Sequence, residues 1–175
     1  MKKNLQIYYN SIIIYDLISK LPRIKNHLQI PKIIAIHINI GLKTITTEKQ
    51  KIISMLTLLK IITNQEPILT KSKKNNIFLK IKKNSIIGCK VTLHKSLIYD
   101  FLEKLLFSAS FSILNINKKS LTLTIPNKHL LNFFELKTEF FSFQKLPSID
   151  VIIQTNTFLK KEFVLLLNLF FCSKK

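Results

Sequence analysis

Apolar and polar side chains alternate along two stretches of the chain in the manner of half-buried β-strands. In residues 30–40 the apolar side carries Ile34, Ile36, Ile38 and Ile40, and the other side carries Ala35, His37 and Asn39. Residues 86–93 show the same two-residue period, and residues 121–125 and 149–155 are further candidate strands. Because side chains along a strand point alternately to the two faces of a sheet, this pattern predicts a half-buried sheet.

Gly88 lies inside the second of these strands and is one of only 2 glycines in the chain. A glycine in the interior of a strand marks a position where another backbone or a ligand comes close. We therefore expect a close approach at Gly88.

Apolar residues spaced three or four apart predict helices between the strands. The expected helices cover residues 5–21, 46–63, 96–105, 127–136 and 157–171, with Pro22 ending the first and Thr46, Thr47 and Glu48 capping the second. This mixed order predicts an α+β fold, a single mixed, mainly antiparallel sheet covered by helices. At 175 residues the chain is expected to form one domain, residues 1–175.

The charge of the chain is strongly positive, with 28 Lys or Arg against 9 Asp or Glu and a formal net charge of +19. Such a charge indicates a polyanionic partner, and nucleic acid is the leading candidate. The densest positive segment is residues 68–83, with Lys71, Lys73, Lys74, Lys80, Lys82 and Lys83. Arg23 is the sole arginine, and lysine lacks the planar fork that reads base edges, so we expect recognition of backbone and shape.

Neither a cofactor site nor a membrane span is predicted. Cys89 and Cys172 are too few for a disulfide framework or a zinc site, and we expect a buried or idle thiol at each. No apolar run approaches the length of a membrane span, and the N-terminus lacks an import leader. Abundant Ile, Lys and Asn suggest an adenine- and thymine-rich gene, which indicates an organelle or a reduced genome; a mitochondrial product would then be made inside the organelle.

Four motifs occur in one order along the chain. They are Ile30-Pro31-Lys32-Ile33 with Asn39-Ile40-Gly41, then residues 62–74 with Gln65, Pro67 and Lys71, then residues 86–105 with Gly88 and Thr92, and finally residues 149–155 with the helix after them. Together they resemble the bacterial-type large-subunit ribosomal protein five family. The resemblance divides the chain into an N-terminal helix and connector (1–29), a best-matched core (30–106), a divergent segment (107–128) and a C-terminal strand and helix (129–175).

The resemblance implies a structural protein of the large ribosomal subunit, here a mitochondrial one, and not an enzyme. Members of the family hold 5S ribosomal RNA on one sheet face in the central protuberance. Expected partners are 5S RNA or its replacement, large-subunit RNA, other protuberance proteins and a small-subunit head protein at an inter-subunit bridge. The expected RNA-binding residues are Asn39, Gln65, Thr92, Lys71, Lys73, Lys74, Lys90 and His94. For Asn39, Gln65 and Thr92 the alternative is a polar residue bonding its own backbone.

Residues 80–87 correspond to a family loop that approaches transfer RNA at the peptidyl site. The implied tRNA-facing residues are Lys80, Lys82, Lys83 and Asn84. Asn84 stands where the family has glycine, and asparagine tolerates positive φ, so the turn is expected to survive. By contrast, the arginine-rich family segment corresponds to residues 111–118, which contain no arginine, so contacts of that segment are not carried over.

Two other function classes remain open from the residues alone. Glu135-Leu136-Lys137 has the Glu-x-Lys form of some metal-dependent nucleases, although no Asp lies between Asp100 and Asp150. A helix over residues 160–171 combines lysine with apolar residues, as in proteins that bind anionic membrane surfaces. A solvated helix end and a core helix are the simpler interpretations.

Overall fold

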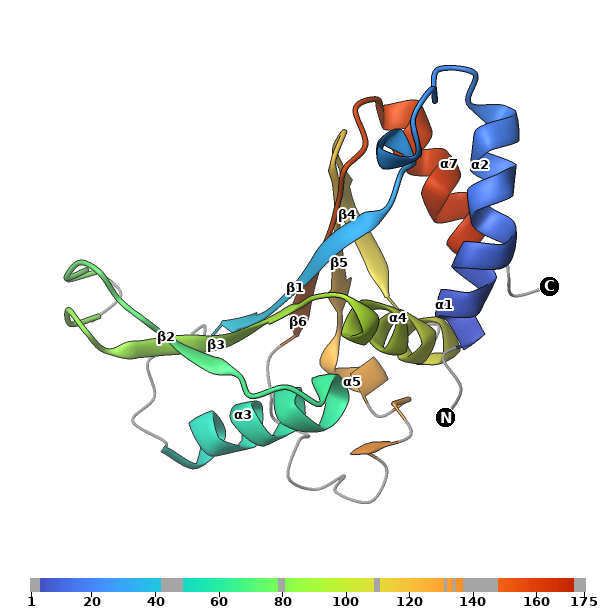
Figure 1. Cartoon of the computed structure of the whole chain (residues 1–175). Coiled ribbons are helices and arrows are strands. Elements are labelled where there is room, and N and C mark those ends of the chain that lie inside the picture. Colours follow the sequence, from blue (N-terminus) through green and yellow to red (C-terminus); the bar gives the residue numbers. More distant parts are fainter. Residues whose placement is uncertain are drawn as a thin grey trace.

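The computed structural model describes residues 4–41, 49–78, 81–108, 111–130, 132–133, 135–136 and 148–171. Its strands are β1 (Ile33–Gly41), β2 (Ile68–Lys71), β3 (Ile86–Leu93), β4 (Ser112–Ile116), β5 (Ser120–Ile125) and β6 (Ile149–Thr155). Among the described residues they form one six-stranded sheet, in the order β2-β3-β1-β6-β5-β4, with antiparallel neighbours (Figure 1). The predicted α+β class is confirmed.

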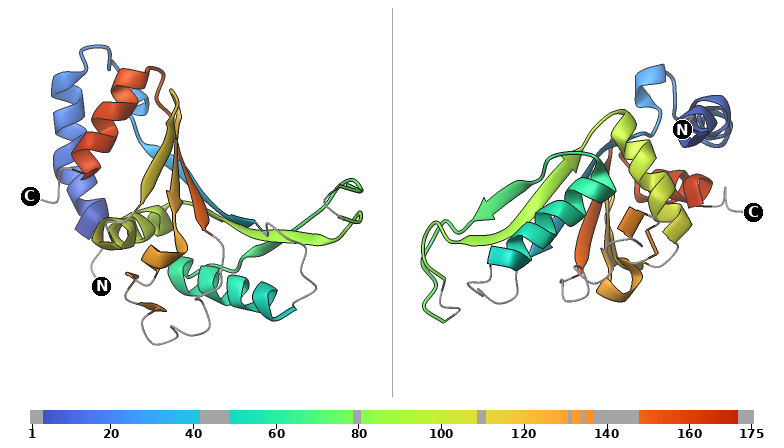
Figure 2. Two further views of the ribbon diagram at one scale, coloured as in Figure 1. Left: turned by 180° about the vertical axis from the view of Figure 1, so that it is seen from behind. Right: turned by 90° about the horizontal axis from the view of Figure 1, so that it is seen from below.

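The helices cover one side of this bent sheet. In chain order they are α1 (Asn4–Tyr8), the π-helical turn η1 (Tyr9–Ile13), α2 (Ile14–Lys20), the 3-10 turn η2 (His27–Gln29), α3 (Lys49–Thr63), α4 (Ser96–Ser108), α5 (Asn127–Leu130) and α7 (Lys160–Phe171). In Figure 1 the longer helices lie below and to the right of the sheet, and the views in Figure 2 agree. The upper left side of the sheet in Figure 1 is uncovered.

Strand β1 shows why the sheet has one buried face. Ile36, Ile38 and Ile40 are buried toward the helices, and Asn39 is exposed on the opposite face. The prediction for Ile34 was wrong, because its side chain is 44% exposed and Ile33 is buried instead. The register against β6 shifts between Ile33 and Ala35, and such a β-bulge reverses the alternation of side chains.

Tyr9 joins the N-terminal helical segment to three other parts of the core. Its hydroxyl donates a hydrogen bond of 2.9 Å to the carbonyl oxygen of Pro31, just before β1. Its ring stacks on Phe170 of α7 at 5.7 Å between centroids and lies 5.8 Å from Tyr99 of α4. Burial, with a smaller contribution from Tyr99, raises the pKa of Tyr9 above its usual value, so its hydroxyl stays neutral.

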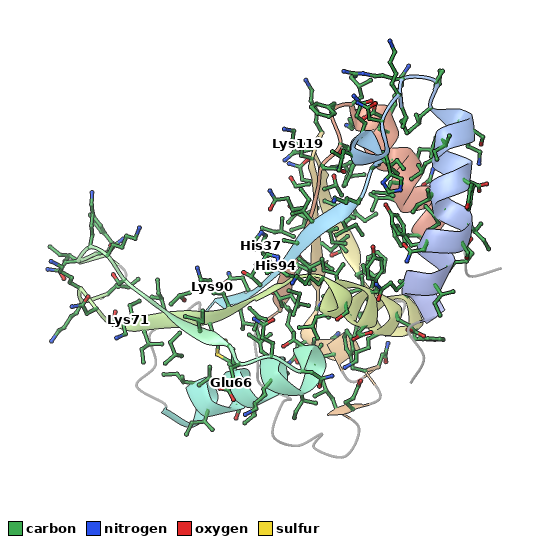
Figure 3. The ribbon with its side chains drawn as sticks, in the orientation of Figure 1. His37, Glu66, Lys71, Lys90, His94 and Lys119 are labelled. Atoms are coloured by element: carbon green, nitrogen blue, oxygen red, sulfur yellow. The ribbon has the colours of Figure 1, made fainter. Side chains whose placement is uncertain are left out.

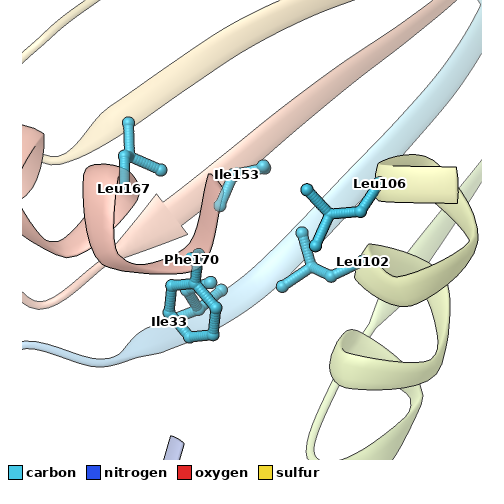
Figure 4. Close-up of a pocket in the computed structure, with 6 residues that line it drawn as sticks. All are labelled: Ile33, Leu102, Leu106, Ile153, Leu167 and Phe170. Carbon is cyan, nitrogen blue, oxygen red and sulfur yellow. The ribbon is translucent and has the colours of Figure 1, made fainter. Parts of the chain in front are cut away.

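Helices α4 and α7 close tightly over β1 and β6. The side chains that meet there are Ile33, Leu102, Leu106, Ile153, Leu167 and Phe170 (Figure 4). The void between them has a volume of about 10 Å³ and an apolar lining. Because a buried water needs polar partners as well as space, this part of the core is dry.

At Gly88 the backbone of β3 comes close to that of β1, and Gly88 faces Gly41 in the register. A Cβ added at Gly88 would lie 2.3 Å from the carbonyl oxygen of Ile40, whereas one added at Gly41 would meet nothing within 4 Å. The close approach expected at Gly88 is confirmed.

Strand β4 was missed by the sequence pattern. Four of its five residues are exposed, and it pairs with β5 at the edge of the sheet. A strand without a buried face has no apolar alternation to reveal it. The helix predicted over residues 127–136 is shorter, since α5 ends at Leu130, and α7 begins at Lys160 instead of residue 157.

Several predictions fall outside the described residues. They are the caps at Thr46, Thr47 and Glu48, the tRNA-facing residue Lys80, and Cys172.

Replacing Gly88 with Ala is expected to destabilise the fold by about 1–3 kcal/mol, because the new methyl group would push β3 away from β1. The matched control is Gly41→Ala, which should change the free energy of unfolding by less than about 0.5 kcal/mol. Urea unfolding followed by circular dichroism measures both. Equal midpoints for the two variants would contradict the close approach.

Burial raises the pKa of the Cys89 thiol from 9.0 to about 12. Because the thiolate is the reactive form, Cys89 in a Cys172→Ser variant should resist a thiol-specific reagent at pH 8 and react once urea unfolds the chain. The same shift leaves stability unchanged below pH 9 and lowers it as the pH rises toward 12. Rapid labelling of the native protein would refute this burial.

Candidate nucleic-acid interface

The uncovered side of the sheet carries two rows of side chains that cross the strands in register. The first row is Ile68, Lys90, Asn39, Asp150 and Thr124, and the second is Thr92, His37, Ile152 and Thr122. We call these residues, with Gln154 and His94, the open face. Figure 3 shows Lys90, His37 and His94 along this side of the ribbon.

His37 holds the centre of the open face together. Its Nδ1 lies 3.1 Å from the hydroxyl oxygen of Thr92, and its Nε2 lies 3.2 Å from Oε1 of Gln154. An amide oxygen only accepts hydrogen bonds, so Nε2 donates, and in the neutral ring the Thr92 hydroxyl donates to Nδ1. The three side chains, from strands β3, β1 and β6, are thereby fixed relative to one another.

Negative charge is concentrated on the helical side of the protein. Four ion pairs there are Lys20 with Asp16, Lys60 with Glu66, Lys104 with Glu135, and Arg23 with Glu162. On the open face, Asp150 is the acidic residue, and its carboxylate accepts a 3.1 Å hydrogen bond from Thr124. Lys90 is exposed in the same row. Lys90 and Asp150 therefore balance each other within this row, and most of the acidic residues that the structure describes lie on the helical side.

A lysine-rich hairpin extends the sheet beyond β2 and β3. We call residues 71–85 the basic hairpin; its described part is 71–78 and 81–85. Asn76 and Ile81 exchange two backbone hydrogen bonds of 2.8 Å, and the Lys83 N–H donates to Oδ1 of Asn75. Asn84 has a φ of 67°, so the turn expected at this position is confirmed. In Figure 1 the hairpin projects to the left, away from the helices.

The tip of the basic hairpin carries two exposed apolar side chains that the sequence pattern did not single out. Ile77 is 89% exposed and Phe78 is 98% exposed. They are flanked by Lys73, Lys74 and Lys82, which are also exposed. The signal available in the sequence was an aromatic residue inside a lysine run, a combination that can stack on bases while the lysines contact phosphates.

The structure brings most of the predicted site residues together. Asn39, Lys90, Thr92 and His94 belong to the open face, and Lys71, Lys73, Lys74, Lys82, Lys83 and Asn84 belong to the basic hairpin. Gln65 belongs to neither group: it lies in the turn where α3 ends, and its backbone N–H donates to the Thr63 hydroxyl at 3.3 Å. Its neighbour Glu66 lies on the α3 side in Figure 3.

The residues that suggested a metal-dependent nuclease or a membrane-surface protein have structural roles. The carboxylate of Glu135 is 2.9 Å from Nζ of Lys104, which also donates to the carbonyl oxygen of Ile62. In the described ranges, no group of three His, Cys, Asp or Glu side chains could hold a metal ion. On α7, Phe163, Leu166 and Phe170 are buried in the core. None of the described helices is long and apolar enough to cross a membrane.

Comparison with known proteins gives one consistent result. The chain is 34% identical over 171 residues to the large ribosomal subunit protein uL5m of Reclinomonas americana, covering 94% of this chain and 93% of that protein. It is 33% identical over 155 residues to uL5 of Ehrlichia canis, covering 85% and 86%. It is 39% identical over 106 residues to uL5 of Mycoplasma mycoides, and this match covers 61% of this chain and 58% of that protein. No family model matches the chain.

Replacing Asp150 with Asn should tighten binding of structured RNA about two- to fivefold, because it removes a negative charge from the row that holds Lys90 while keeping an oxygen for Thr124. Asp16→Asn is the matched control, since it changes the net charge equally on the helical side. Filter binding at fixed salt measures both. An equal effect of the two variants would show that overall charge, not the open face, decides affinity.

Proposed function

The chain belongs to the uL5 family of large ribosomal subunit proteins, and we propose that it binds ribosomal RNA through the open face and the basic hairpin. The observation that carries this proposal is the one-sided arrangement of the sheet. Helices and ion-paired acids occupy one side, while the other presents Asn39, Lys90 and the hydrogen-bonded His37–Thr92 pair. A polar surface that continues into a lysine-rich hairpin suits contacts to phosphate and ribose.

The ligand of the open face is 5S ribosomal RNA or the RNA that replaces it, together with neighbouring large-subunit RNA in the central protuberance. Lysines neutralise phosphates, and Asn39 and Thr92 supply polar groups that fix the register. The single arginine of the chain lies elsewhere, in the connector before β1. Recognition of RNA shape and backbone therefore outweighs the reading of base edges.

The basic hairpin extends toward transfer RNA at the peptidyl site. The geometry of the hairpin supports this proposal, because residues 76 and 81 pair through their backbones and hold lysines and Phe78 beyond the sheet. Other protuberance proteins and a small-subunit head protein at an inter-subunit bridge are the proposed protein partners. The protein has a structural role without a cofactor and without catalysis.

The proposed location is the large subunit of a mitochondrial ribosome, in the matrix, with the gene in the organelle. The mitochondrial-type relative from Reclinomonas supports the location. The low Gly content and the abundance of Ile, Lys and Asn support an organelle gene. Co-sedimentation of the native protein with large mitochondrial subunits tests the location, and recovery only in ribosome-free fractions would refute it.

Lys90→Gln should weaken binding of 5S-type RNA and lower the slope of log affinity against log salt by about 1, because one phosphate contact is lost. Lys128→Gln is the matched control, since Lys128 is an exposed lysine of α5 on the helical side. Filter binding over a salt series, with an unrelated folded RNA in parallel, measures both. Equal affinity for the two RNAs, or equal slopes for the two variants, would contradict specific binding by the open face.

A further inference from the structure

A second cationic surface surrounds Phe158, between β6 and α7. Phe158 is 60% exposed, so it is not part of the buried core. The guanidinium carbon of Arg23 lies 5.6 Å from the ring centroid, and Nζ of Lys119 lies 5.8 Å from it. Both cations are within the range of cation–π attraction, so two positive side chains lie close to an exposed aromatic residue.

Hydrogen bonds join three segments that are distant in the sequence at this surface. Oδ1 of Asn156 accepts the Lys32 N–H at 2.7 Å, and its amide donates to the carbonyl oxygen of Ile30 at 3.1 Å. On the other side, the hydroxyl of Thr157 donates to the carbonyl oxygen of Lys118 at 2.7 Å. The segment that carries Phe158 is therefore fixed to the β4–β5 turn and to the entry of β1.

The carboxylate of Glu162 bonds the backbone that carries Phe158, and it is largely buried. Its Oε2 accepts the backbone N–H groups of Phe158 and Leu159, each at 3.2 Å, and its other carboxylate oxygen lies 4.0 Å from Arg23. The negative charge of Glu162 is thus used within the fold and offers little repulsion to an anion outside.

A hollow of about 140 Å³ lies beside the ring. Its lining consists of Arg23, Ile24, Gln29, Phe158 and Glu162. A cavity of about 150 Å³ can hold a benzene ring. This hollow therefore has room for one six-membered ring of a planar base, with polar groups at its edge.

Apart from the largely buried Glu162, the charged residues around the hollow are all cations. Residues 22–32, 117–119 and 156–161 contain no acid, and their cations are Arg23, Lys25, Lys32, Lys118, Lys119, Lys160 and Lys161. We call this surface, with Phe158, the cationic pole. In Figure 3 Lys119 lies at the upper end of the sheet, while Lys71 marks the hairpin at the left end. The cationic pole is therefore distinct from the basic hairpin.

We propose that the cationic pole binds a single-stranded RNA segment, with one unpaired base stacked on Phe158 and Arg23 at the hollow and phosphates on the surrounding lysines. An aromatic ring, a planar guanidinium group and several lysines are the combination that binds unpaired bases. An acidic protein segment would pair with the lysines but would gain little from an exposed ring. The site goes beyond the RNA contacts proposed for the open face and does not depend on them.

The test uses the full-length protein and a short single-stranded RNA that contains the fluorescent base 2-aminopurine. The chain contains no tryptophan, so protein emission does not obscure the signal. Stacking should quench the fluorescence. Phe158→Ala should abolish the quenching and weaken binding about tenfold, while Phe158→Tyr, which keeps the ring, should retain both. Phe107→Ala is the matched control, because Phe107 is an 80% exposed phenylalanine on α4.

Unchanged quenching and affinity in Phe158→Ala would overturn the proposal. So would binding without quenching in the unaltered protein, or preferential binding of an acidic peptide at the cationic pole. Phe158 is mostly exposed, and thermal unfolding checks that each variant keeps its fold. Lys90→Gln separates the two proposals: it should weaken 5S-type RNA binding and leave the 2-aminopurine signal intact. Failure at Phe158 alone would refute only the cationic pole.

Discussion

Burial of only one face of the antiparallel sheet is the constraint on which the rest of the protein depends. Each strand must send alternate side chains into the helical side, so Ile36, Ile38 and Ile40 pack inward. The residues between them must then point outward. Because neighbouring strands are held in register, the outward residues of β3, β1 and β6 form continuous rows, and His37 can bond Thr92 and Gln154 at once. The same alternation that builds the core therefore builds the surface that we propose for RNA.

The distribution of charge follows from this one-sided fold. Several of the few acidic residues pair with nearby cations on the helical side, as Glu135 does with Lys104. The lysines of β3 and of the basic hairpin have no comparable acidic neighbours among the described residues, apart from Asp150 on the open face. A protein with a net charge of +19 repels itself, and a polyanion on the uncovered side relieves that repulsion. The proposed RNA binding therefore implies that assembly with ribosomal RNA stabilises the folded chain.

The sequence predicted the elements whose pattern reports burial. Strands β1, β3, β5 and β6 and the helices α3, α4 and α7 all have an apolar side, so their periods were visible in the residues. Strand β4 has none, and the bulge near Ile34 shifts the alternation through contact with a distant strand. Some of the candidate site residues could likewise be predicted from the sequence, and others could not. Asn39, Lys90 and Thr92 were predictable from strand position and family motifs, whereas Phe78 and Phe158 became candidates once their exposure was known.

By itself, the sequence determined the α+β class and the family and indicated a polyanionic partner, because periodicity, ordered motifs and net charge can be read from the residues without the fold. The tertiary structure decided which residues share a surface. It set Gln65 in the turn after α3, outside the rows that cross β1 and β3. It also brought Arg23, Lys119 and Phe158 together from three distant segments. Such proximity depends on strand register and on packing between distant parts of the chain, which no local pattern in the residues reports.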